Sequence, residues 1–120
     1  MAKILVLDDV SDAAHLIKRI LSDVGHEVFP FTEEADALQY VKENQVDLAI
    51  LDIKLKRMSG IDVLAEIKKN APATLAIILT AYPTTETEQE AKRLGASEYC
   101  VKPIDNVELE RTVAKVLGAS

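Results

Sequence analysis

The feature that most constrains the fold is a repeated alternation of short apolar runs with segments of helical periodicity. The apolar runs are short, as is typical of strands buried in a sheet, and they lie at 4–7, 26–31, 46–52, 75–79 and 97–101. Helix-like segments follow them, at 11–24, 32–44, 60–71, 85–94 and 105–117. Strands joined by such short helical crossovers pair in parallel, through right-handed connections.

This alternation predicts the fold class: α/β, a single doubly wound (βα)5 sandwich of three layers. The flavodoxin-like sheet order 2-1-3-4-5 is the natural choice for five strands, although periodicity alone does not fix that order. Pro30 interrupts the second run and indicates an edge strand, because proline cannot donate to a sheet ladder. A length of 120 residues suits one core and not two, so we expect one domain over residues 1–120.

Composition excludes several kinds of partner. The net charge is −6, from 14 basic and 20 acidic residues, which argues against direct nucleic-acid binding because that needs clustered Lys and Arg. No apolar run approaches ~18 residues, so no membrane span is expected. The N-terminus enters a strand at once and is not a signal peptide. The single Cys100 excludes an internal disulfide and suits a reducing compartment, so a cytoplasmic location is expected.

Acidic residues stand where two of the apolar runs end. Leu48 to Leu51 is followed directly by Asp52, and the first run is followed by Asp8 and Asp9. Because burying an unpaired carboxylate is costly, these acids are expected where the strands leave the core, at the carboxyl edge of the sheet. In open parallel sheets, ligands bind at that edge.

Thr80 and Lys102 end the fourth and fifth runs and should reach the same edge. Three carboxylates in proximity repel one another unless a cation lies between them, and a few hard oxygen ligands beside open space suit Mg²⁺. A lysine can contact a phosphoryl oxygen, and a carboxylate can act as nucleophile to give an aspartyl phosphate. Each residue alone also fits an ordinary role in a turn, strand or loop, but the four strand ends together favour phosphoryl chemistry.

The sequence resembles the receiver domain of two-component response regulators over nearly its whole length. The resemblance rests on Asp8-Asp9, Asp52, Thr80-Ala81 and Tyr99-Cys100-Val101-Lys102-Pro103, with a similar loop from Leu55 to Gly60. Any one of these pieces is weak, whereas their combination and order are highly specific.

The resemblance implies that Asp52 accepts a phosphoryl group from a sensor histidine kinase or a phosphotransfer protein. It implies that Mg²⁺ is the cofactor. Asp9, Asp52 and the main-chain carbonyl of Lys54 would bind the ion, and Asp8 would help through water. The domain would not be an enzyme in the usual sense, since it would catalyse only its own phosphorylation and slow dephosphorylation.

The resemblance also implies a conformational switch. Lys102 would contact the phosphoryl group, Thr80 would move to hydrogen-bond it, and Tyr99 would swing inward into the vacated space. The Lys102-Pro103 peptide would be cis. The output would be control of an effector domain, or self-association, through residues 84–117.

The loop after Asp52 departs from the family pattern. Receiver domains usually have proline at the position of Lys56, whereas this loop reads Lys54-Leu55-Lys56-Arg57. A solvated basic loop is the simpler interpretation. The alternative is that the loop tunes access to the phosphate or selects a partner.

Three other functions compete with the signalling switch. An aspartyl-nucleophile phosphatase of the haloacid-dehalogenase type needs a second Asp two residues after the nucleophile, and position 54 is Lys. A flavodoxin-type cofactor carrier needs a loop rich in glycine and hydroxyls after the first strand, where this chain has Asp8-Asp9-Val10. The third is a receiver-like interaction module that is never phosphorylated, and the complete acidic site argues against it.

The remaining expectations concern particular surfaces. Val10, Ala13, Ala14 and Ile104 would form an apolar patch that docks a helical phosphodonor, unless Ala13 belongs to the core. The 85–94 helix offers few apolar residues inward, so it should be weakly anchored and able to move.

Two expectations concern single side chains. Thr32 would cap the second helix, whose first turn would hold Glu33 and Glu34. By analogy with the family, Lys54 and Tyr82 would flank the approach of a hydrolytic water and slow self-dephosphorylation, unless both point into solvent.

Overall fold

The computed structural model describes residues 1–118, in which five strands alternate with five helices. In chain order the elements are β1 (Lys3–Leu7), α1 (Ser11–Asp23), β2 (Glu27–Phe31), α2 (Glu34–Glu43), β3 (Leu48–Leu51), α3 (Gly60–Asn70), β4 (Leu75–Thr80), α4 (Thr85–Arg93), β5 (Glu98–Val101) and α5 (Asn106–Gly118). Each element falls within a few residues of an expected segment. Across residues 1–118, no helix has both the length and the apolar character needed to cross a bilayer.

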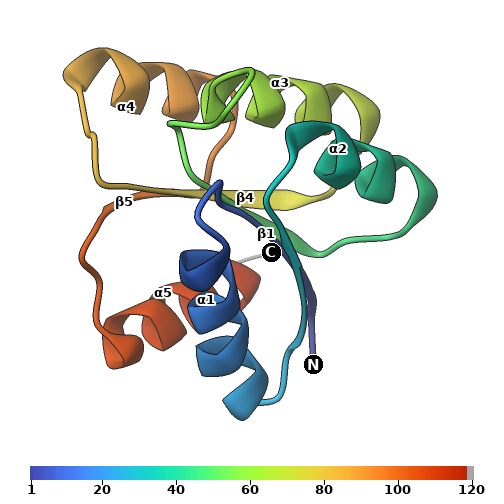
Figure 1. Ribbon diagram of the computed structural model, residues 1–120, viewed down its shortest axis with the longest axis vertical. Coiled ribbons are helices and arrows are strands. Elements are labelled where there is room, and N and C mark those ends of the chain that lie inside the picture. Colours follow the sequence, from blue (N-terminus) through green and yellow to red (C-terminus); the bar gives the residue numbers. More distant parts are fainter. Residues whose placement is uncertain (119–120) are drawn as a thin grey trace.

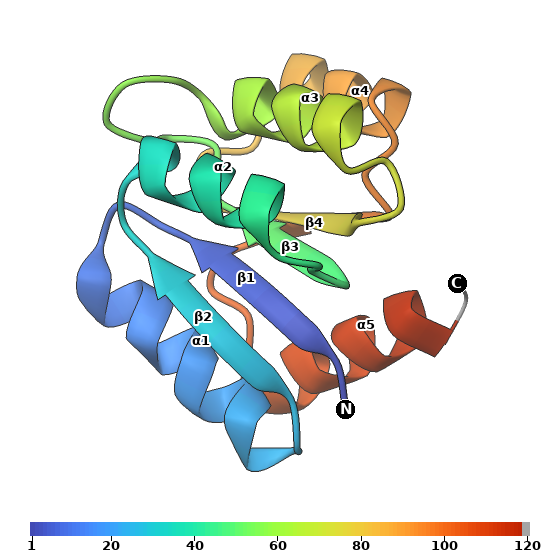
Figure 2. The same ribbon diagram turned by 90° about the vertical axis from the view of Figure 1, so that its right-hand side faces the viewer.

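The strands form one parallel sheet in the order β2-β1-β3-β4-β5, which confirms the predicted topology. β2, which contains Pro30, lies at an edge of this sheet as predicted. Helices α1 and α5 cover one face of the sheet, and α2, α3 and α4 cover the other (Figures 1 and 2). The result is the expected three-layer sandwich.

The apolar core lies in two layers, one on each side of the sheet. Alternate residues of β1 enter opposite layers: Ile4 and Val6 pack on the α1–α5 side, and Leu5 and Leu7 pack on the side of α2, α3 and α4. All four are almost fully buried, as are the residues of β3. Because the central strands are held on both faces, the residues that follow them have fixed positions at the carboxyl edge.

α4 is weakly anchored, as its sequence predicts. The structure describes this helix in full, and only Ala91 of its nine residues is buried. α3 beside it buries Val63, Leu64 and Ile67. Thr84 caps α4 in a reciprocal capping box with Thr87, which satisfies backbone N–H groups at its first turn.

Two surface expectations are wrong. Ala14 is fully buried against the sheet, whereas Leu16 is 49% exposed, so the inward stripe of α1 consists of Ala14, Ile17, Ile20 and Leu21. An alanine is small enough for either face of a helix. Here α1 is rotated so that Ile17, Ile20 and Leu21 pack on the sheet, which also buries Ala14. Thr32 does not cap α2, because the N-cap position is occupied by Glu33, without a side-chain cap hydrogen bond.

Candidate functional site

The three acids expected to cluster do meet at the carboxyl edge of the sheet. Asp8 and Asp9 follow β1, and Asp52 follows the neighbouring strand β3, where Leu7 is paired with Leu51. Each acid offers a carboxylate oxygen, and these oxygens lie within 4.8 Å of one another. Asp8 and Asp52 are buried and Asp9 is half-buried, so one acid of the cluster is more accessible than the other two.

Lys102 from the end of β5 joins this cluster. Its Nζ lies 2.5 Å from Oδ2 of Asp8 and 3.2 Å from Oδ2 of Asp52. Burial on its own lowers the pKa of Lys102. The carboxylates of Asp8 and Asp52 raise that pKa by more, so it lies above the ordinary value for a lysine. Lys102 is therefore a fixed positive charge at neutral pH, next to the candidate acceptor.

Backbone N–H groups orient both buried acids. Oδ1 of Asp8 accepts from the N–H of Val10 at 2.9 Å, and Oδ1 of Asp52 accepts from the N–H of Ile53 at 2.7 Å. Each carboxylate thus uses one oxygen to brace itself and directs the other toward Lys102. This arrangement limits the rotation of both side chains.

The donor set fits a magnesium ion. It consists of hard carboxylate oxygens beside a partly open acid, which is the type of site that Mg²⁺ occupies while keeping several waters. The clustering of Asp8, Asp9 and Asp52 also leaves more negative charge than Lys102 alone neutralises. Lys54, the expected carbonyl ligand, lies two residues past Asp52 in the β3–α3 loop.

Gly60 makes the closest backbone approach to the acceptor. A Cβ at this position would lie 1.8 Å from the main-chain oxygen of Asp52, a distance that no side chain tolerates. The Gly60 N–H also donates to the Ile53 oxygen at 2.8 Å. Glycine is therefore required where α3 begins, because the start of the helix packs directly on the strand end that presents Asp52.

Thr80 ends β4 at the same edge and is fully buried. Its Oγ1 accepts from the N–H of Tyr82 at 3.0 Å, a bond that uses an oxygen lone pair and not the hydroxyl proton. The main-chain oxygen of Thr80 accepts from the Lys102 N–H at 2.8 Å, which ties the ends of β4 and β5 together.

Tyr99 lies apart from the acids, on β5 beside α4. Its half-buried ring packs on the core layer under α2, α3 and α4. Its hydroxyl lies 2.7 Å from Oγ1 of Thr87 and accepts from the N–H of Thr84 at 3.4 Å. The structure therefore links Tyr99 to the capped first turn of α4. The Lys102-Pro103 peptide is cis, as the resemblance implies.

Lys54 and Tyr82 contact each other. Lys54 Nζ lies 4.2 Å from the centroid of the Tyr82 ring, a cation–π geometry between the β3–α3 and β4–α4 loops. Both residues are exposed, Tyr82 to 58%. The two side chains thus form one exposed pair.

Glu34 was missed by sequence reasoning as a contributor to this region. It is only 3% exposed, and Oε2 accepts from the N–H of Arg57 at 2.5 Å and of Met58 at 2.9 Å. Burial on its own raises the pKa of Glu34, but these N–H donors and the Arg57 charge lower it below the ordinary value. The partners are more than twenty residues away in sequence, so no local pattern could have indicated this contact.

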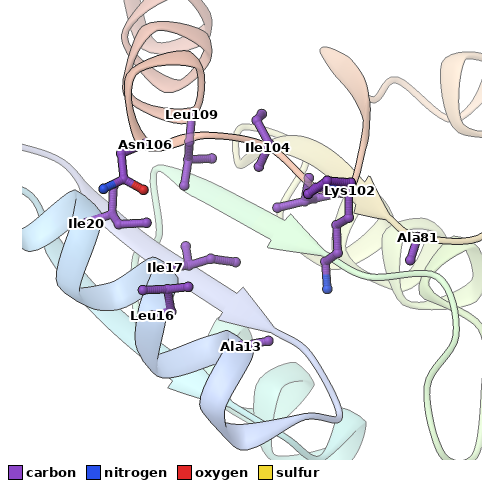
Figure 3. Close-up of a pocket in the computed structure, with 11 residues that line it drawn as sticks. Ala13, Leu16, Ile17, Ile20, Ala81, Lys102, Ile104, Asn106 and Leu109 are labelled. Carbon is purple, nitrogen blue, oxygen red and sulfur yellow. The ribbon is translucent and has the colours of Figure 1, made fainter.

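An apolar groove of about 370 Å³ lies between α1 and the β5–α5 segment (Figure 3). Ala13, Leu16 and Ile17 lie on one side, and Ile104 and Leu109 lie on the other. Lys102 and Pro103 also line the groove, so it reaches the candidate site. Of the four residues expected to form an apolar patch, Ala13 and Ile104 line this groove, whereas Val10 and the buried Ala14 do not, and Leu16 is an unexpected member.

Known proteins are similar in sequence to almost the whole of this chain. "Transcriptional regulatory protein ZraR" of Escherichia coli K12 is 37% identical over 115 residues, which cover 96% of this chain and 26% of that protein. "Sporulation initiation phosphotransferase F" of Bacillus subtilis 168 is 34% identical over 115 residues, which cover 96% of this chain and 93% of that protein. The chain thus spans about a quarter of the transcriptional regulators that it matches and nearly all of the phosphotransferase.

Solved structures agree with this relationship. A receiver domain protein (CheY-like) from Methanospirillum hungatei JF-1 superposes with a TM-score of 0.96 at 28% identity, covering 99% of this chain and 95% of that chain. The regulator TrrA of Thermotoga maritima, in complex with Mg²⁺-BeF, superposes with a TM-score of 0.87 at 34% identity, covering 97% and 99%. The family model described as "Response regulator receiver domain" matches residues 4–114. With its sheet topology, its acidic strand ends and these relatives, the chain belongs to the receiver domain family of two-component response regulators.

Proposed function

We propose that Asp52 is the phosphoacceptor of this receiver domain. The observation that supports this most directly is the convergence of Asp8, Asp9, Asp52 and Lys102 from three strand ends into one cluster. Asp52 is braced through Oδ1, so its position is set before a donor arrives. In the transfer, a carboxylate oxygen of Asp52 attacks the phosphorus of a phosphohistidine. The P–N bond breaks, the imidazole keeps the electron pair, and an acyl phosphate forms.

Mg²⁺ is the proposed cofactor, held by Asp9, Asp52 and the Lys54 carbonyl, with Asp8 acting through water. When bound, the ion would offset the negative charge that gathers on the phosphoryl oxygens. Lys102 is already paired to both buried acids, and it would exchange part of that pairing for a phosphoryl oxygen. Self-phosphorylation from a small donor follows from the same arrangement.

The proposed phosphodonor is a sensor histidine kinase or a phosphotransfer protein that presents a helix to the apolar groove. The groove adjoins Lys102, and its exposed Leu16 and half-buried Ala13 supply an apolar surface. Leu16→Arg should slow transfer from the donor protein and leave labelling by acetyl phosphate unchanged. Equal slowing of both reactions would count against docking at this groove.

The proposed output passes through Thr80 and Tyr99 to the surface formed by residues 84–117. Thr80 would turn its hydroxyl proton toward a phosphoryl group on Asp52, and Tyr99 would change its contact with the first turn of α4. α4 buries little, so a small change in free energy can shift it. Control of an effector domain, or association of two copies, would follow from that shift.

The experiment that tests the acceptor is labelling with acetyl phosphate in the presence of Mg²⁺, followed by intact mass. Wild type should gain one phosphate, and Asp52→Asn should gain none under the same conditions. Asp9→Ala should raise the Mg²⁺ concentration required. Labelling of Asp52→Asn at the wild-type level would show that the acceptor is elsewhere.

A further inference from the structure

Glu34 is a buried acid that lies outside the cluster of Asp8, Asp9 and Asp52. It begins α2, and its side chain bonds to the β3–α3 loop. Its second oxygen, Oε1, is buried without a hydrogen-bond partner among residues 1–118. An ionised carboxylate in such a position is costly, so the two N–H bonds that it accepts must compensate.

These bonds hold the middle of the loop that follows the phosphoacceptor. At the start of the loop, the Asp52 N–H donates to the Leu7 oxygen at 3.0 Å, and at its end the Gly60 N–H donates to the Ile53 oxygen at 2.8 Å. Between these points, Glu34 accepts the N–H groups of Arg57 and Met58. The β3–α3 loop is therefore fixed at its start, its middle and its end.

The start of α2 holds the loop at a second, weaker point. Lys56 Nζ donates to Oε2 of Glu33 at 2.6 Å, but both side chains are well exposed, so solvent screens this pair. Leu55 and Met58 also pack on the apolar layer beneath α2 and α3. Removing Glu34 should therefore loosen the loop without releasing it.

Lys54 lies in the short span between the fixed points. The backbone has only two soft dihedral angles per residue. Fixing Arg57 and Met58 by hydrogen bonds therefore restricts how the Lys54 carbonyl can turn. We propose that Glu34 is a positioning residue of the metal site: it fixes the loop so that the Lys54 carbonyl is presented to the ion, and does not itself touch the ion. This inference rests on the proposed Mg²⁺ site.

The test is a titration of the full chain with Mg²⁺, followed by the amide chemical shifts of the loop and the acidic cluster. Glu34→Ala should weaken Mg²⁺ binding about tenfold, the lower end of the effect seen for partners that orient a metal ligand. It should also speed amide exchange at Arg57 and Met58. Glu34→Gln keeps an acceptor oxygen of the same shape, so its Mg²⁺ affinity should stay within about threefold of wild type.

Thr74→Ala is the matched control for lost stability. Thr74 is 3% exposed and its Oγ1 donates to the Val46 oxygen at 2.8 Å, at the opposite edge of the sheet. The Thr74→Ala substitution removes a buried hydrogen bond, as Glu34→Ala does, but it does so far from Asp8, Asp9 and Asp52. Its Mg²⁺ affinity should equal that of wild type even where its unfolding midpoint falls.

Three results would overturn the inference. Unchanged Mg²⁺ affinity in Glu34→Ala would mean that the loop is held without Glu34. Equal losses in Glu34→Gln and Glu34→Ala would mean that the charge acts, and not the position. A matching loss in Thr74→Ala would mean that general destabilisation explains the effect.

Asp9→Ala in the same titration separates this inference from the proposed function. If Asp9→Ala weakens binding and Glu34→Ala does not, only the positioning role fails. If Asp9→Ala binds Mg²⁺ as wild type does, the proposed metal site is wrong and the role of Glu34 falls with it.

Discussion

The contact between Lys54 and Tyr82 predicts how long an aspartyl phosphate on this domain survives. The two residues lie two positions past Asp52 and Thr80, and Lys54 Nζ sits 4.2 Å from the Tyr82 ring centroid. By resemblance to the family, we expect these positions to flank the path of the water that hydrolyses the acyl phosphate. We expect the Lys54–Tyr82 pair, held together by this contact, to cover that path and slow hydrolysis.

The magnitude follows from the strength of the contact. An exposed cation–π pair contributes about 0.5–1 kcal/mol. Because ~1.4 kcal/mol changes a rate tenfold, opening the pair should shorten the phosphoryl half-life by about two- to fivefold. Tyr82→Ala and Lys54→Ala should each have this effect. The double variant should fall short of the product of the two, because either change alone breaks the same contact.

The assay is the decay of phosphorylated protein after the small donor is removed. Tyr82→Phe keeps the ring and is the matched control, and its half-life should equal that of wild type. If both alanine variants decay at the wild-type rate or more slowly, the Lys54–Tyr82 pair does not shield the acyl phosphate from water. If their effects multiply fully in the double variant, the two side chains act independently and the contact is irrelevant.

Three further predictions concern stability and motion. Gly60→Ala should lower the free energy of unfolding by about 2–3 kcal/mol in urea titrations, whereas Gly118→Ala, with nothing within 4 Å of its added Cβ, should not. Tyr99→Phe removes the hydroxyl that contacts Thr87, so amide exchange in the first turn of α4 should accelerate about fivefold; unchanged exchange would refute the link. Burial, followed by the N-terminal charge, lowers the pKa of His26 below 6.5, so neutral His26 stabilises the fold above that pH and this contribution is lost as pH falls. His26→Gln should therefore lose less stability than wild type between about pH 7.5 and about pH 5.5.

The fold and the acidic cluster were predictable because both follow from local patterns combined with topology. Short apolar runs and amphipathic segments define the elements. Parallel pairing then brings all carboxyl ends to one edge, so Asp8 and Lys102 could be placed together despite lying 94 positions apart in sequence. The same logic anticipated the weak anchoring of α4, since its sequence offers little beyond Ala91 and Leu94 to bury.

The remaining details depend on tertiary contacts that no local pattern encodes. From the sequence, Glu34 is expected to be an acid in the first turn of a helix. In the structure its side chain is buried and accepts hydrogen bonds from the N–H groups of Arg57 and Met58. Ala14 reads as surface because alanine suits both faces of a helix, and only the packing of α1 on the sheet decides. The pairing of Lys54 with Tyr82 likewise depends on how two loops approach each other.

Mapping the phosphorylated residue tests the central claim most directly. The protein is incubated with acetyl phosphate and Mg²⁺, and the acyl phosphate is then reduced with borohydride, which converts the modified aspartate to homoserine. The peptides are sequenced by mass spectrometry. Homoserine at position 52, dependent on Mg²⁺ and lost in Lys102→Ala or Asp9→Ala at limiting Mg²⁺, is the predicted result. Homoserine at position 8 or 9, or no reduction product at all, would contradict the assignment of Asp52 as the phosphoacceptor.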